Sequence, residues 1–138
     1  LGLDLKAGDD VITTNQDYGR MLQTYDQRVL RDGITLTKLS FKVPATAAEL
    51  VKVFEQAITP KTKLIHFSHI TNLTGQIFPA KEICAMARAK GITPFVVSID
   101  KGGHDYLRQM CGDLGYEVVS NIDALPRRLP ALYRRLTT

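Results

Sequence analysis

The chain has 138 residues, of which 44% are hydrophobic and 23% charged, and this composition is ordinary for one globular domain and excludes a disordered or fibrous protein. No apolar run approaches the roughly 18 residues that a membrane span needs, so we expect a soluble protein without a membrane partner. The formal net charge of +4 comes from four arginines near the end of the chain, which interleave with leucines at helical spacing (Arg127, Arg128, Arg134 and Arg135). These arginines indicate the solvated face of a terminal helix, and we expect a monomer with no nucleic-acid partner.

The start of the chain and its cysteines bear on its cellular location. The chain opens Leu1-Gly-Leu-Asp, without an initiator methionine or a signal peptide, and reads as though cut out of something longer. Cys84 and Cys111 are too few for a disulfide framework, so we expect two reduced thiols packed as small hydrophobes. Reduced cysteines favour a cytoplasmic location.

Five strand-like segments alternate with helical segments. The first strand covers residues 10–14, and a helix runs from about residue 17 to 31 and stops at Asp32-Gly33. A second strand over residues 34–43 alternates apolar and polar positions and ends at Pro44.

The second helix begins at Thr46-Ala-Ala-Glu49, which has the spacing of a capping box. The run Phe95-Val-Val-Ser-Ile99 is the most strand-like of the chain, and its lack of alternation predicts that Val96 and Val97 are buried on both faces. The other expected elements follow the same rhythm: a strand over 63–70, a helix from Pro79 to Lys90-Gly91, a helix over 104–113, a strand over 117–120, and a last helix from Pro126 or near Pro130.

This strict alternation predicts an open parallel sheet with helices on both faces and right-handed crossovers. We expect one α/β domain over residues 1–138, a five-stranded, doubly wound three-layer sandwich of the flavodoxin-like or Rossmann-like kind. The expected strand order is 2-1-3-4-5, with 2-1-4-3-5 as the alternative.

The first two thirds of the chain carry a long and specific resemblance. The residues that carry it are Gly8-Asp-Asp-Val-Ile-Thr-Thr14, Asp17-Tyr-Gly19, the unbroken stretch from Ala57 to Pro79, and Lys81-Glu-Ile-Cys84. With these, residues 1 to about 90 resemble the large domain of fold-type-I pyridoxal-phosphate (PLP) enzymes of the class V aminotransferase group, near the isopenicillin-N-epimerase-like and cysteine-desulfurase-like members.

From about residue 90 the sequence changes. The stretches Lys90-Gly-Ile-Thr-Pro-Phe-Val-Val-Ser-Ile-Asp100 and Leu125-Pro-Arg-Arg-Leu-Pro130 resemble the C-terminal part of von Willebrand factor A domains, in the bacterial type associated with nitric oxide reductase activation. The two resemblances meet inside one helix, at Ala87-Arg-Ala-Lys-Gly91. We interpret the chain as a recombined, engineered α/β scaffold; a divergent natural family that echoes both parents is the alternative.

The PLP resemblance implies a Schiff-base lysine and a phosphate-binding Ser/Thr segment. The phosphate segment of the family precedes the position of Leu1 and its lysine follows the join, so we expect no enzymatic activity and no cofactor of this chain's own. Three residues match the family's cofactor site as vestiges: Tyr18 in the segment of the ring-stacking residue, Asn72 near the cofactor hydroxyl, and Asp100 in place of the pyridine-pairing acid. The alternative for each is a loop-capping residue at a strand end.

The sequence contains no motif for a metal site. The metal-binding Asp-x-Ser-x-Ser segment of von Willebrand A domains is absent, and no His/Cys spacing specifies zinc, so we expect no metal site. We expect His66 to be a satisfied packing residue within its strand. Two further readings remain beside the scaffold: residual weak binding of PLP or phosphate at the carboxyl ends of the strands, and an interaction protein that uses the last helix or a sheet edge.

Overall fold

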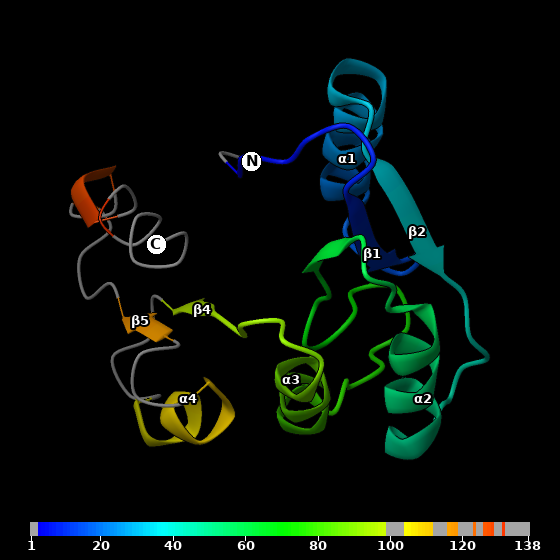
Figure 1. The fold of residues 1–138 in the computed structure, drawn as a ribbon. Helices are drawn as coiled ribbons and strands as arrows, with labels where there is room; N and C mark the ends of the chain where they lie inside the picture. The colour runs from blue at the N-terminus through cyan, green and yellow to red at the C-terminus, as the bar shows by residue number, and fades with distance from the viewer. Residues whose placement is uncertain are drawn as a thin grey trace. The chain divides into compact units, whose positions relative to one another are not determined.

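The computed structural model describes residues 3–98, 104–111, 116–118, 123, 126–128 and 131. Within them, strands and helices alternate as predicted: β1 (Asp10–Thr14), α1 (Gly19–Asp32), β2 (Thr35–Leu39), α2 (Ala47–Ala57), β3 (Thr62–Ile65), α3 (Ala80–Ala89), β4 (Val96–Ser98), α4 (His104–Cys111) and β5 (Tyr116–Val118) (Figure 1). The chain divides into two compact units, residues 1–83 and 84–138, with the boundary inside α3. That residues 1–138 fold as one domain stays a prediction.

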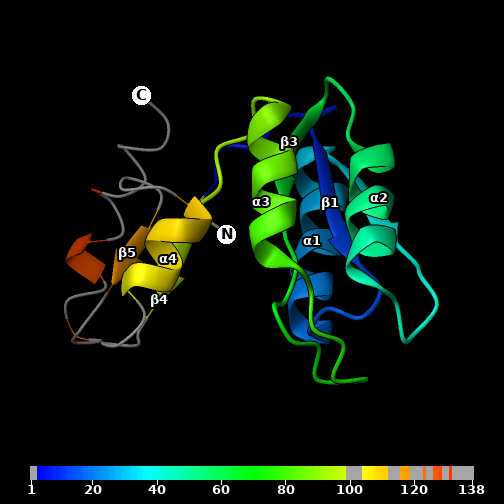
Figure 2. The same ribbon diagram turned by 90° about the horizontal axis from the view of Figure 1, so that it is seen from below.

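The first unit is built on a three-stranded parallel sheet in the order β2-β1-β3. Every residue of β1 is buried, because β1 lies between two strands and has helices on both faces. Figures 1 and 2 show α1 on one face of the sheet and α2 on the other. On the α1 face, Val11, Tyr25 and Ile34 form a buried cluster with Leu64 packed against it. On the α2 face, the ring of Phe54 packs against other phenylalanine rings.

A buried aspartate at the start of β1 joins this strand to both of its neighbours. Asp10 is the first residue of β1, and its carboxylate accepts hydrogen bonds from the hydroxyls of Thr37 in β2 (2.9 Å) and Thr62 in β3 (3.1 Å). The backbone N–H of Asp10 also donates to the carbonyl of Lys61 (2.8 Å). These bonds help to fix the register of the sheet at the edge opposite to the candidate site.

The helix ends follow local signals. α1 ends at Gly33, which is left-handed (φ +68°) and donates its N–H to the carbonyl of Val29, as the Asp32-Gly33 stop predicts. α2 begins with the predicted capping box, in which Thr46 and Glu49 each accept a hydrogen bond from the backbone N–H of the other. α1 starts at Gly19 and not near Asp17, because the Asp17 side chain is hydrogen-bonded to the end of β1.

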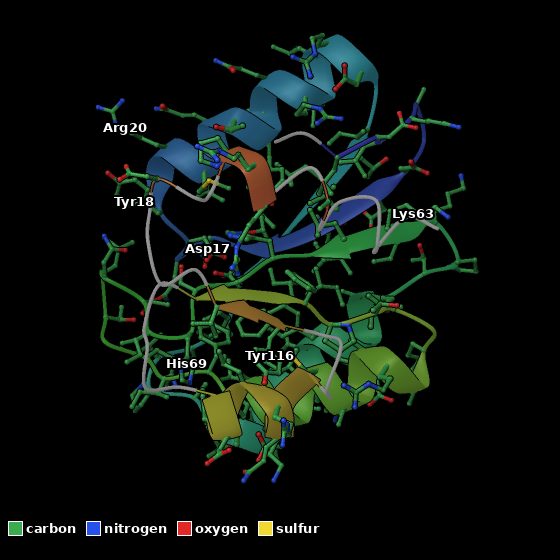
Figure 3. The ribbon with its side chains drawn as sticks, turned by 90° about the vertical axis from the view of Figure 1, so that its left-hand side faces the viewer. Asp17, Tyr18, Arg20, Lys63, His69 and Tyr116 are labelled. Carbon is green, nitrogen blue, oxygen red and sulfur yellow. The ribbon has the colours of Figure 1, made fainter. Side chains whose placement is uncertain are left out.

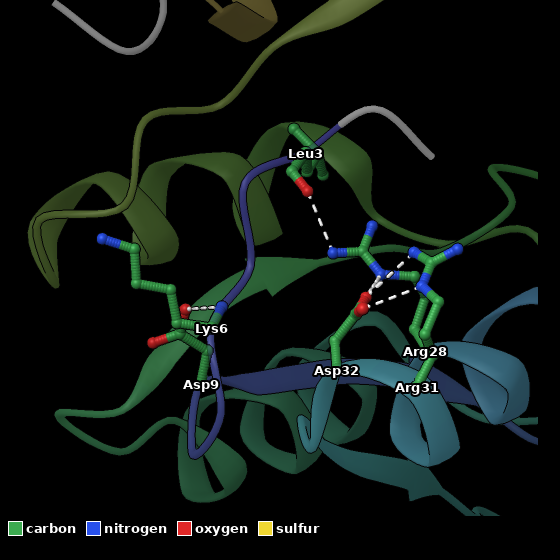
Figure 4. A network of polar contacts seen from close by, with 6 residues as sticks. All are labelled: Leu3, Lys6, Asp9, Arg28, Arg31 and Asp32. Carbon is green, nitrogen blue, oxygen red and sulfur yellow. Dashed lines mark hydrogen bonds and ion pairs between the residues drawn. The ribbon is translucent and has the colours of Figure 1, made fainter.

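The segment before β1 is fastened to α1 by a buried arginine (Figure 4). Arg28 donates to the carbonyl of Leu3 (3.0 Å) and pairs with Asp32, which also binds Arg31 (2.8 Å). The Arg31 hydrogen bond, aided by Arg28, lowers the pKa of Asp32 to about 2. The carboxylate of Asp32 therefore stays ionised at any physiological pH, as an ion pair with two arginines requires.

In the second unit, β4 and β5 pair in parallel with Val96 opposite Tyr116, and α4 lies between them in the sequence. α3 ends in a Schellman-type turn at Gly91 (φ +79°), as predicted. Residues 126–128 are helical, in agreement with a last helix that begins at Pro126. No helix among the described residues is long and apolar enough to cross a membrane.

The sheet confirms one part of the predicted topology. The order 2-1-3 is observed, and the direct pairing of β1 with β3 shows that the alternative 2-1-4-3-5 is wrong, because that order places the fourth strand between them. Among the described residues β4 and β5 form a sheet of their own, so the continuous five-stranded order 2-1-3-4-5 is not confirmed. The expected burial of Val96 and Val97 concerns side chains outside the described ones.

Candidate functional site

The candidate site is the edge of the first unit's sheet where the strands end. β1 and β3 are parallel neighbours, so the segments that follow them, residues 15–18 and 66–79, leave the sheet at the same edge. In Figure 3, Asp17, Tyr18 and His69 lie toward this edge and Lys63 lies at the opposite one. We call residues 15–18 and 66–79 together the carboxyl-edge loops.

Asp17 joins these two loops. One oxygen of its buried carboxylate, Oδ2, accepts hydrogen bonds from the Thr13 hydroxyl (2.9 Å), the Thr14 hydroxyl (2.8 Å) and the Thr14 backbone N–H (2.9 Å). The other oxygen, Oδ1, accepts from the backbone N–H of Ser68 (2.7 Å). Burial raises the pKa of Asp17, but these hydrogen bonds outweigh it and hold the pKa below its usual value of 3.8. Asp17 is thus an ionised, hydrogen-bonded carboxylate beneath the loop surface.

A second set of hydrogen bonds fixes the outer part of the loops. Thr74 donates to the side-chain oxygen of Gln16 (2.6 Å) and its hydroxyl pairs with that of Thr71 (2.8 Å). The side-chain amide of Gln76 accepts from the backbone N–H of Ala45 (2.9 Å) and donates to the carbonyl of Ala45 (3.2 Å). The loops that follow β1, β2 and β3 are therefore held to one another by side chains.

The residues predicted from the sequence occupy this edge in part. Tyr18 lies directly before α1, is 53% exposed, and makes no side-chain capping bond to the helix, which argues against a capping role. Asn72 is exposed in the loop after β3, and the Thr74–Gln16 hydrogen bond joins the loop of Asn72 to that of Tyr18. Asp100 lies outside the described residues. The cofactor roles of all three stay predictions.

Sequence reasoning missed Asp17 and misjudged His66. The pattern Thr-Thr-x-x-Asp after a buried strand is a signal for a carboxylate that turns back onto the strand end, and it could have identified Asp17. His66 packs against Tyr25, with ring centroids 5.7 Å apart, but its buried Nδ1 has no hydrogen-bond partner among the described residues. The expectation of a histidine with all its hydrogen bonds made is therefore wrong, because the ring packs against Tyr25 but Nδ1 has no hydrogen bond.

Comparison with known proteins establishes the family. Residues 1–104 match the profile of the Aminotransferase class-V family, so the chain belongs to this family. It is 34% identical over 95 residues to an isopenicillin N epimerase of Streptomyces clavuligerus, and 28% identical over 101 residues to a probable cysteine desulfurase of Halalkalibacterium halodurans. These alignments cover 68% and 73% of the chain but 24% of each relative, so the chain spans about a quarter of their length.

A solved structure of a PLP-dependent enzyme shows the same likeness in three dimensions. The cystine C-S lyase C-DES, in complex with its product cysteine persulfide, superposes with a TM-score of 0.55 and is 30% identical, over 63% of this chain and 23% of that one. The likeness supports a parallel α/β fragment of a PLP-dependent enzyme fold.

The C-terminal part of the chain matches different proteins. Protein NorD of Brucella melitensis is 45% identical over 49 residues, and the uncharacterized protein PA0525 of Pseudomonas aeruginosa is 46% identical over 50 residues. Each match covers 36% of this chain and 8% of the relative. The predicted two-part resemblance is confirmed, although the class-V match extends to residue 104, past the expected join near residue 90.

The described residues of the carboxyl-edge loops do not fit PLP as a complete set. Neither residues 15–18 nor residues 66–79 include a lysine that could hold the cofactor as an imine. Within the described residues, no group of three or more His, Cys, Asp or Glu side chains could hold a metal ion.

Proposed function

We propose that this chain is a folded α/β scaffold that carries no turnover of its own. The carboxyl-edge loops support this proposal, because they contain no lysine and because Asp17, Thr74 and Gln76 use their polar side chains to hold the loops together. PLP catalysis needs an amine and a phosphate site held together, since both fix the reacting bond relative to the ring. Loops without an amine can preserve a fold through such hydrogen bonds, but they cannot form the covalent link to PLP.

The test uses the 138-residue chain with PLP and either alanine or cysteine. We expect no transamination, epimerisation or desulfuration above the rate of free PLP at the same concentration. Lys101 is the nearest amine in the sequence after β4, so Lys101→Ala and Asn72→Ala are the variants that decide the matter. Turnover that both substitutions abolish would overturn the proposal, because the chain would then carry an activity that depends on its own residues.

A second candidate function is weak binding of PLP or phosphate at the same edge. It is favoured by the exposed ring of Tyr18 and the exposed amide of Asn72, which lie on two loops joined by a hydrogen bond. An absorbance titration with PLP, followed by borohydride reduction and peptide mapping, would place any aldimine on one lysine. Specific binding should weaken several-fold in Tyr18→Ala and Asn72→Ala, and Lys63→Ala at the opposite edge is the matched control.

We also propose that the chain is recombined, as an engineered scaffold would be. Its two parts match unrelated relatives, of which it covers about a quarter and less than a tenth. α3 runs unbroken from Ala80 to Ala89 and closes with the turn at Gly91, in the region where the two resemblances meet. An uninterrupted helix at this point is what a join between two compatible βα units requires.

A further inference from the structure

Two buried polar atoms in the first unit are explained neither by the core nor by the hydrogen bonds of the carboxyl-edge loops. The hydroxyl of Tyr25 in α1 and Nδ1 of His66, the residue that follows β3, are buried and have no partner among the described residues. Their rings lie against each other at 5.7 Å with a tilt of 57°. Nearly all buried polar atoms in proteins are hydrogen-bonded, so an unpaired pair such as this calls for an explanation.

The pair restricts the charge state of His66. A neutral imidazole can leave one nitrogen without a proton, but an imidazolium has an N–H on both. Protonation would therefore bury a charged donor at Nδ1 with no acceptor, which is costly. Within the part of the chain that the structure describes, the ring of Tyr25 from α1 packs on the imidazole, and the charge of Asp17 from the loop after β1 acts on it. Burial lowers the pKa of His66, and the Asp17 carboxylate offsets part of this effect.

His66 also lies where two backbone hydrogen bonds hold the start of the loop after β3. Its backbone N–H donates to the carbonyl of Ile12 in β1 (2.8 Å), where the pairing of β1 with β3 ends. Two residues on, the backbone N–H of Ser68 donates to Asp17 (2.7 Å). These bonds fasten residue 66 to β1 and residue 68 to the loop after β1, and they flank the stretch of backbone that a displaced His66 ring would move.

We propose that His66 is an acid-sensitive latch, whose protonation expels the ring from its contact with Tyr25 and releases residues 66–79 from the end of β1. The released state accepts a proton more readily than the closed state, so the closed state is favoured above the ordinary histidine pKa of about 6.5. It loses this advantage as the pH falls below that value. The Asp17 carboxylate stays ionised throughout this pH range, and its charge reduces the lowering of the His66 pKa without reversing it.

The latch can be tested by amide hydrogen exchange of the full chain between pH 7.5 and 5.5, corrected for the intrinsic exchange rates. Protection of the His66 and Ser68 amides should fall by up to about tenfold per pH unit below pH 6.5. His66→Phe keeps an aromatic ring against Tyr25 and removes the titration, so its protection should not change with pH. His69→Gln removes an exposed histidine of the same loop and should behave like the unmodified chain.

Either of two results would overturn the latch. One is equal protection of these amides at pH 7.5 and 5.5 in the unmodified chain. The other is a loss of protection with falling pH that persists in His66→Phe. If His66→Phe does not fold, an NMR titration of the unmodified chain decides: His66 must titrate below the ordinary histidine pKa of about 6.5, and the amide shifts of residues 66–68 must follow its titration.

Discussion

Two aspartates, one at each end of the central strand, hold the first unit together. Asp10 connects the start of β1 to the middle of β2 and the start of β3 through threonine hydroxyls, and Asp17 connects the end of β1 to the loop after β3. Both are buried, and a buried carboxylate is tolerated only where donors surround it. The buried hydrogen bonds of the first unit thus gather at the two ends of β1, where carboxylates accept them from threonine hydroxyls and backbone N–H groups.

Substitution of Asp17 tests this role. In Asp17→Asn an amide NH₂ replaces one oxygen, so at least one of the donors from Thr13, Thr14 or Ser68 loses its acceptor in a buried position. We expect urea unfolding to show a loss of about 2–3 kcal/mol. Asp26→Asn is the control, because Asp26 forms an exposed pair with Lys38 and should change the stability by less than about 1 kcal/mol.

The same carboxylate predicts a pH dependence that is separate from that of His66. The pKa of Asp17 lies below 3.8 in the folded state. The ionised carboxylate therefore adds to the free energy of unfolding above the unfolded-state pKa, and this stabilisation is lost as the pH falls through the folded-state pKa. The unmodified chain should therefore lose stability below about pH 4, and Asp17→Asn should lose less over that range. Equal acid sensitivity in both proteins would show that the Asp17 hydrogen bonds do not control it.

At the scale of single residues, the sequence predicts the position of those residues that a local pattern or a family resemblance identifies. Tyr18 and Asn72 are placed at the carboxyl edge because the strands that precede them are recognisable. The pattern Thr-Thr-x-x-Asp indicates only the local hydrogen bonds of Asp17, and His66 has no local signal, because the remaining partner of Asp17 and the ring beside His66 are distant in the chain. The acceptor of the Ser68 N–H lies 51 residues earlier, and the ring that packs on His66 belongs to α1.

At the scale of elements, helix ends that carry a local signal are predictable, and the first strand is found over the expected residues 10–14, but the carboxyl ends of the second and third strands are not predictable. The Thr46 capping box and the Gly33 stop are local signals, and both are confirmed. The second strand was expected over 34–43 and the third over 63–70, but they cover Thr35–Leu39 and Thr62–Ile65. A strand needs a hydrogen-bonded partner, and Thr14, the last residue of β1, already pairs with Leu39.

Gly33 gives a test at this scale. A Cβ at this position would require a left-handed backbone for alanine and would lie 3.3 Å from the Cβ of Ala7. We expect Gly33→Ala to lower the free energy of unfolding by about 1–2 kcal/mol, measured by urea denaturation. Gly19→Ala is the matched control within α1, because nothing lies within 4 Å of its Cβ position and its φ is not positive, and it should be neutral or slightly stabilising.

At the scale of the whole molecule, the βα alternation predicts the class of fold but not how far one sheet continues. In the order 2-1-3, β1 and β2 are neighbours, whereas the connection from β2 to β3 crosses over β1. β4 and β5 pair with each other, and the expected five-stranded sheet needs them to continue from β3. The part of the chain that resembles class-V enzymes and the part that resembles NorD would then complete one sheet between them.

Val97→Asp tests whether they do. If β4 is a central strand of one five-stranded sheet, an unpaired charge in the run Phe95-Val-Val should destabilise the entire chain severely, by several kcal/mol. Hydrogen exchange should then lose protection in β1 as well as in β5, and thermal unfolding should remain a single transition at a lower temperature. Thr93→Asp, at an exposed position shortly before β4, is the control and should melt like the unmodified chain.

Two outcomes would contradict the continuous sheet. A Val97→Asp protein that melts within a degree or two of the unmodified chain would show that this strand is not central. Protection that is lost in β5 but kept in β1 would show that the two units unfold independently, because the charge would then reach only its own sheet. A broad melt of the unmodified chain with strong dye binding would instead indicate that the join at residues 87–91 leaves a molten core, since such a core lacks fixed packing on either side of the helix.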